Sequence, residues 1–123
     1  MMATVLAVDD LKSMRHMLSL TLSGAGFDVT KANNGKEALS KIDACEPDII
    51  LADIDMPELD GMELVRQVRG IPRFANTPIL VISTNPKASS DEKARAKAAG
   101  ANGWLCKPLN PNNLIATVEH LLS

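Results

Sequence analysis

Aromatic residues are scarce in this sequence: they make up 2% of it, tyrosine is absent, and only Phe27, Phe74 and Trp104 are present. Proteins that bind single-stranded nucleic acid stack its bases on aromatic side chains, so this class is disfavoured. The formal net charge is -2, which predicts no polybasic face for a phosphate backbone or an anionic membrane. We therefore expect an aliphatic core, and neither nucleic acid nor a membrane as a partner.

Long apolar runs and paired cysteines are also missing. No run approaches the roughly 18 residues that a membrane-spanning helix needs, and the first residues lead into a strand-like run without the segments of a signal peptide. Cys45 and Cys106 lie far apart with no CxxC pair, so we interpret them as structural thiols in a reducing compartment. These features predict a cytoplasmic protein with one domain, residues 1–123.

The sequence does contain a repeated alternation of short β-branched or leucine-rich runs with longer amphipathic runs. The strands are expected at residues 4–8, 27–32, 49–52, 79–82 and 103–106. The helices are expected at residues 13–23, 34–43, 62–70, 90–100 and 111–122. Asn34 with Glu37 resembles a capping box, and Asn110 before Pro111 marks another helix start. Apolar strands that alternate with helices favour a parallel sheet covered on both sides, a doubly wound α/β domain.

Polar side chains follow four of the five expected strands. Because the carboxyl ends of parallel strands meet at one edge of a sheet, these side chains should converge there. They are Asp9 and Asp10 after the first strand, Asp53 with Asp55 after the third, Ser83 with Thr84 after the fourth, and Lys107 after the fifth.

This set of side chains suits phosphoryl transfer. Clustered carboxylates raise each other's pKa unless a cation neutralises them, and hard oxygen ligands in an open site suit Mg²⁺. An aspartate such as Asp53 is an established nucleophile that forms an aspartyl-phosphate. Lys107 adds a second positive charge, and Ser83 could donate a hydrogen bond to phosphoryl oxygens. His16 and His120 fall on expected helices away from this edge, and we assign them no metal role.

The order Asp9-Asp10, Asp53, Ser83 and Lys107-Pro108 resembles the receiver domain of two-component response regulators. Met56-Pro57 and Asp60-Gly61 are similar to that family's loop after the phosphorylated aspartate, and residues 98–108 resemble the single-domain, chemotaxis-type (CheY-like) regulators. The resemblance covers essentially the whole chain. It implies a five-stranded sheet in the order 2-1-3-4-5, for which this family is itself a standard example.

The resemblance also implies a role for each matching residue. Asp53 would accept a phosphoryl group from a phosphohistidine on a sensor kinase, and Ser83 and Lys107 would bind that group. The Mg²⁺ ligands would be Asp10 and Asp53 directly, Asp9 through a water, and the backbone carbonyl of Asp55. Trp104 would be a switch residue on a protein-binding face formed by the fourth helix, the fifth strand and the fifth helix; a half-buried structural role is the alternative.

Some positions depart from the family's common pattern. Leu11 follows the acidic pair where a small polar residue is frequent, and Pro86 restricts the loop after the fourth strand. We expect Asp55 and Asn85 to modulate the lifetime of the phosphorylated form.

Three other functions are weighed against this one. Asp53-Ile54-Asp55 fits the DxD motif of haloacid-dehalogenase-type phosphatases, but a late acidic pair is missing and the motif is not on the first strand. A flavodoxin-like FMN carrier would need a phosphate loop where Asp9-Asp10 stand. A receiver-like module that is never phosphorylated would not need the full set of charged residues. We expect no output domain after the fifth helix, a monomer, and output through a protein partner that the sequence does not name.

Overall fold

The computed structural model describes residues 3–54, 61–83 and 90–123. Strands and helices alternate along these residues, as the sequence predicts. The strands are β1 (Thr4–Val8), β2 (Asp28–Ala32), β3 (Ile49–Asp53), β4 (Ile79–Ser83) and β5 (Gly103–Cys106). The helices are α1 (Lys12–Gly24), α2 (Gly35–Cys45), α3 (Gly61–Arg69), α4 (Ser90–Ala99) and α5 (Pro111–Leu122), with a 3₁₀ turn, η1 (Pro72–Phe74), before β4.

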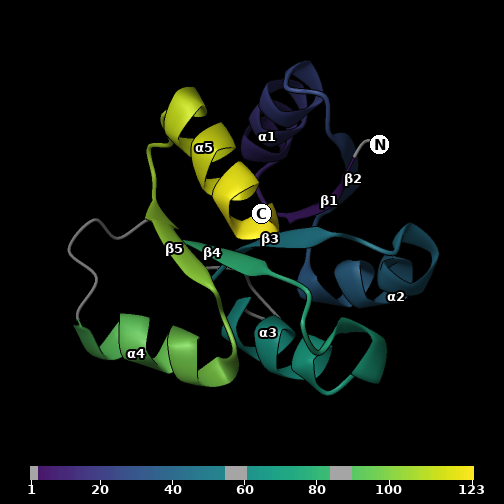
Figure 1. The fold of residues 1–123 in the computed structure, drawn as a ribbon, viewed down its shortest axis with the longest axis vertical. Helices are drawn as coiled ribbons and strands as arrows, with labels where there is room; N and C mark the ends of the chain where they lie inside the picture. The colour runs from purple at the N-terminus through teal and green to yellow at the C-terminus, as the bar shows by residue number, and fades with distance from the viewer. Residues whose placement is uncertain (1–2, 55–60, 84–89) are drawn as a thin grey trace.

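The strands form one parallel sheet in the order β2-β1-β3-β4-β5. The helices α1 and α5 cover one face, and α2, α3 and α4 cover the other (Figure 1). This arrangement confirms both the doubly wound fold and the strand order expected from the resemblance. The order reverses beside β1, between β1 and β3, and ligands of such sheets bind beyond the carboxyl ends of the strands at such a point.

The core lies on both faces of the sheet. Leu18 and Leu22 of α1 and Leu114 and Val118 of α5 pack on one face, while α2 and α3 cover the other with a separate apolar cluster. Every residue of β3 and β4 is buried, which explains why their sequences are apolar without alternation. Their last residues are polar, so the central strands deliver two buried polar side chains to the carboxyl edge.

Local signals set the helix ends. The Asn34 side chain accepts a hydrogen bond from the Glu37 backbone N–H (2.8 Å), which confirms the predicted N-cap of α2. Asn110 caps α5 in the same way and Pro111 is its first residue, as predicted. The η1 turn was not predicted, because a three-residue helix has no periodic pattern to detect. In the part of the chain that the structure describes, no helix has the length and apolar character needed to cross a membrane.

Candidate functional site

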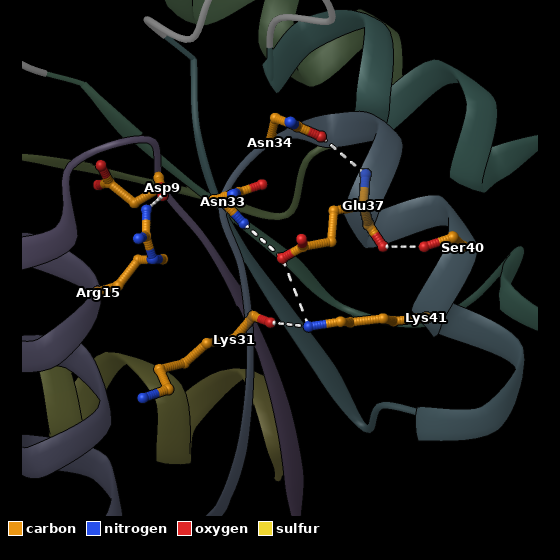
Figure 2. Close-up of polar contacts among 8 residues, drawn as sticks. All are labelled: Asp9, Arg15, Lys31, Asn33, Asn34, Glu37, Ser40 and Lys41. Atoms are coloured by element: carbon orange, nitrogen blue, oxygen red, sulfur yellow. Dashed lines mark hydrogen bonds and ion pairs between the residues drawn. The ribbon is translucent and has the colours of Figure 1, made fainter.

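The site lies at the carboxyl edge of the sheet, and β1 brings the first carboxylate to it. Asp9 follows β1 directly and is fully buried. Its Oδ1 accepts a hydrogen bond from the Leu11 N–H (2.9 Å), which holds the turn into α1. The Arg15 guanidinium, one turn into α1, donates to the Asp9 carbonyl oxygen (2.7 Å), as Figure 2 shows. The first contact holds the carboxylate of Asp9 and the second holds its backbone, and both leave Oδ2 for other partners.

A lysine joins the first and third strands at this edge. Asp53 ends β3 and is 2% exposed. Lys107 Nζ lies 3.0 Å from Asp53 Oδ2, to which it donates a hydrogen bond, and 3.0 Å from Asp9 Oδ2. The Lys107 backbone is held as well, because its N–H donates to the Ser83 carbonyl (2.8 Å). The sequence predicted that these groups converge, and the structure brings them into direct contact.

Burial and charge together set the protonation of this cluster. Burial lowers the pKa of Lys107, but the hydrogen bond to Asp53 and the close contact with the Asp9 carboxylate outweigh it, so the pKa lies above its usual value. Burial raises the pKa of Asp9, and the nearby Asp53 charge adds to that effect; the Leu11 N–H and Lys107 oppose it only in part. The fold therefore holds Asp9 in a place where its negative charge is incompletely compensated.

The donor set fits a hard divalent cation. Asp9, Asp10 and Asp53 each offer a carboxylate oxygen, and these oxygens lie within 4.8 Å of one another. Asp9 Oδ2 is buried and lacks a well-aligned hydrogen bond within the described ranges, and the Lys107 ammonium, 3.0 Å away, forms an ion pair with it. Asp10 is exposed, which leaves the cluster open toward solvent. A magnesium ion, which prefers carboxylates and retains waters, suits such an open oxygen site.

The other predicted residues fall in different places. Ser83 ends β4, is 1% exposed and pairs in register with Cys106, so it lies at the same edge as Asp53. Trp104 lies on β5 and is half-buried, and its Nε1 is buried with no acceptor among the residues described. Asp55 and Asn85 lie outside the described residues, so their modulating roles stay predictions. The same holds for the Asp55 carbonyl as a metal ligand.

Sequence reasoning missed the contact between Arg15 and the Asp9 carbonyl. A side chain that reaches a backbone oxygen six residues earlier follows no helical or strand spacing. It depends on the angle at which α1 leaves β1. The one available signal was an arginine in the first turns after the acidic pair, to which the sequence analysis gave no role.

An acidic cluster with two buried members beside a lysine, at the switch point of a doubly wound sheet, fits a phosphoacceptor site of the signalling type. The comparisons with known proteins agree. Residues 5–119 match the response regulator receiver domain family. The chain is 38% identical over 120 residues to the chemotaxis protein CheY1 of Helicobacter pylori, covering 96% of this chain and 95% of that protein.

Solved structures show the same likeness. The chemotaxis protein CheY4 of Vibrio cholerae superposes with a TM-score of 0.94 at 44% identity, covering 98% of this chain and 99% of that one. A putative response regulator of Chloroflexus aurantiacus gives a TM-score of 0.92 at 36% identity, covering 99% and 98%. The chain belongs to the response regulator receiver domain family. It is a CheY-like phosphoacceptor of two-component signalling, not a phosphatase of the haloacid-dehalogenase type.

Proposed function

We propose that Asp53 is the residue that accepts the phosphoryl group, and that Mg²⁺ bound by the acidic cluster assists the transfer. The observation that carries this assignment is the pairing of Asp53 Oδ2 with Lys107 Nζ at 3.0 Å, within a cluster that also includes Asp9 and Asp10. Asp53 is the one of the three carboxylates that ends a central strand. It therefore has the most rigid support for an in-line attack.

Each side chain then has a definite task. A carboxylate oxygen of Asp53 forms a bond to phosphorus while the bond from phosphorus to the donor nitrogen breaks, and the histidine leaves with its electron pair. When bound, the metal would be held by Asp10 and Asp53, with Asp9 through a water, and would offset negative charge on the phosphoryl oxygens. The Lys107 ammonium moves away from one carboxylate oxygen of Asp53 and pairs with the incoming phosphoryl group. Ser83 donates a hydrogen bond to the same group.

The partners follow from the family and from the surface of β5. The phosphodonor of a receiver domain is a histidine kinase. We assign the downstream contact to the face formed by α4, β5 and α5, where a cleft of about 280 Å³ is lined by Lys93, Ala96 and Trp104 among others. The likeness to CheY1 and CheY4 supports a chemotaxis-type pathway for this chain. A monomeric state and a cytoplasmic location stay predictions.

The test is phosphorylation by acetyl phosphate, read as intact mass. The wild-type protein should gain one phosphoryl group when Mg²⁺ is present and none when a chelator replaces it. Asp53→Asn should gain none under either condition. Asp28→Asn is the matched control, because this exposed aspartate begins β2 at the opposite edge of the sheet. Equal labelling of Asp53→Asn and wild type would refute the assignment, and absence of labelling in wild type would favour a receiver-like module that is not phosphorylated.

A further inference from the structure

A second polar cleft lies between α1, β2 and α2, away from the cleft on β5. It has a volume of about 420 Å³, and its lining includes Lys12, Arg15, His16, Lys31, Glu37 and Lys41. Figure 2 shows four of these side chains arriving from three elements: Arg15 from α1, Lys31 from β2, and Glu37 and Lys41 from α2. Residues far apart in the sequence therefore surround one hollow of the surface.

The lining is strongly basic. Four side chains of Lys or Arg face one carboxylate, Glu37, so these groups carry a net charge of +3 with His16 neutral. The whole chain carries -2. From the net charge of the sequence we expected no polybasic face. That expectation does not hold at this cleft, because a sum over the chain does not register basic residues that only the fold brings together. A concave site that gathers one sign of charge concentrates ions of the opposite sign.

Part of this lining is held rigidly. Lys41 Nζ donates to the Lys31 carbonyl (2.8 Å) and lies 3.4 Å from Glu37 Oε1. The Asn33 N–H donates to the same Glu37 oxygen (2.9 Å) and lowers the pKa of Glu37, with a smaller effect from Lys41. Arg15 is held by the Asp9 carbonyl. The single acid is therefore held by two donors, and its one negative charge cannot balance the four cations of the lining.

Two other cations are available to a ligand. Lys12 and Lys31 are exposed, and within the described ranges neither ammonium has a hydrogen bond or ion pair; the Lys31 side chain reaches away from the Lys41 contact in Figure 2. Ammonium groups bind phosphate as point charges that approach from several directions. Among the described residues that line the cleft there is no Phe, Tyr or Trp, so its positive charges are the main feature that a ligand would meet.

We propose that the cleft between α1, β2 and α2 is a second anion site, which binds a compact, multiply charged phosphate compound through Lys12, Lys31 and Arg15. This site is distinct from the phosphoacceptor edge, where three carboxylates gather and repel anions. The two sites share one link, the Arg15 contact with the Asp9 carbonyl. Asp53 is not among the described residues that line the cleft, so binding there does not depend on Asp53, and its test is independent of the proposed function.

The probe is inorganic tripolyphosphate in metal-free buffer, followed by calorimetry and by two-dimensional NMR of backbone amides. The wild-type protein should bind it, with amide shifts concentrated in residues 12–16 and 31–41. Affinity should fall as salt is added, because exposed charges are screened. The double variant Lys12→Gln, Lys31→Gln should bind about tenfold more weakly or worse, which corresponds to about 1.4 kcal/mol.

The matched control is Lys93→Gln, Lys97→Gln, which removes the same total charge from exposed positions on α4. It should keep wild-type affinity, as should Asp53→Asn. Equal weakening in the two double variants would overturn the proposal, since the effect would then come from net charge alone. The proposal would also be overturned if the amide shifts centred on Asp53, Ser83 and Lys107, or if the wild-type protein did not bind tripolyphosphate. Equal affinity for citrate would overturn it as well.

Discussion

The ammonium of Lys107 and the carboxylate of Asp53 meet at 3.0 Å across the sheet edge, although 54 positions separate them in the sequence. Both side chains are largely buried, at 9% and 2% exposed. The same ammonium lies 3.0 Å from Asp9 Oδ2. In the absence of a metal, Lys107 is thus the cation that the described residues supply to two buried carboxylates.

Removing this cation should destabilise the metal-free protein. In Lys107→Met the aliphatic stem is kept but Asp9 and Asp53 lose the ammonium charge, and breaking a buried ion pair costs about 3–5 kcal/mol. Urea unfolding at neutral pH should show this loss, and Mg²⁺ should restore a larger part of the stability in the variant than in wild type. Lys97→Met, on the exposed side of α4, should change little.

The pH dependence of this pair has a definite sign. The pKa of Lys107 is raised above 10.5 in the folded state, so its stabilising effect is complete below 10.5 and disappears as the pH rises through the folded value. The difference in stability between wild type and Lys107→Met should therefore be constant at neutral pH and shrink only in strongly alkaline buffer. A difference that already shrinks between about pH 7 and 9 would contradict the raised pKa.

The effect of Asp9 has the same sign but falls in the acidic range. Burial raises its pKa above 3.8 in the folded state, so the native protein binds more protons than the unfolded chain between these two values, and stability falls as the pH rises through that window. Asn cannot titrate. The free energy of unfolding of metal-free Asp9→Asn, relative to wild type, should therefore increase from about pH 4 to pH 7.

Mg²⁺ provides the control for Asp9. A bound cation favours the charged carboxylate, so saturating Mg²⁺ at neutral pH should stabilise wild type more than Asp9→Asn. A relative stability that is flat across the acidic range without metal would show that the folded pKa of Asp9 is not raised.

The fold was predictable because local signals agree with each other. The five strands and five helices follow from the spacing of apolar residues, from the N-caps at Asn34 and Asn110, and from Pro111 at the first position of the last helix. Boundaries moved by one or two residues, as in α1, which begins at Lys12 instead of Ser13. The predicted capping box of α2 differs in one contact: the Glu37 carboxylate accepts from the Asn33 N–H, one residue before the cap, because the chain leaves β2 at that point.

The site was predictable only at the level of which strand ends contribute. Placing Asp9, Asp53, Ser83 and Lys107 at one edge requires just the parallel topology. Three features of the site depend on side-chain directions. Lys107 contacts both carboxylates, Asp9 Oδ2 lacks a well-aligned hydrogen bond, and Arg15 holds the Asp9 carbonyl. The sequence does not encode these directions in any spacing.

Hydrogen bonds between Arg69 and Gly100 are another contact that was not predicted from the sequence. The Arg69 guanidinium donates to the Gly100 carbonyl from both Nε (3.0 Å) and Nη2 (2.8 Å), joining the end of α3 to the end of α4. Gly100 has φ of +119°, a region that side chains disfavour. A Cβ there would also lie 2.7 Å from Arg69 Cγ.

Gly100→Ala should therefore be destabilising by about 1–3 kcal/mol, from backbone strain and from displacement of Arg69. Gly24→Ala is the matched control, because a Cβ at Gly24 meets nothing within 4 Å. It should be neutral or slightly stabilising. Thermal or urea unfolding of both variants checks the difference, and equal effects would show that the contact with Arg69 is easily rearranged.

Trp104 gives an optical reading of the proposed switch. It is the only tryptophan, it pairs in register with Val81 of β4, and it packs against the apolar cluster beneath α2 and α3. Ser83 lies two residues after Val81 on β4, and Lys107 lies three residues after Trp104. The indole is therefore attached to the same two strands whose ends would bind the phosphoryl group.

If phosphorylation draws Ser83 toward the new oxygens, volume opens behind it, and the half-buried indole gains free energy by filling that volume. Fully burying a large apolar side chain is worth about 1.5–3 kcal/mol, enough to shift a two-state equilibrium about tenfold or more. Emission should then move to shorter wavelength when Mg²⁺ and acetyl phosphate are added. The shift should be smaller in Ser83→Ala and absent in Asp53→Asn. Protein that mass measurement shows to be phosphorylated, with an unmoved spectrum, would assign Trp104 a structural role, because its environment would not respond to the phosphoryl group.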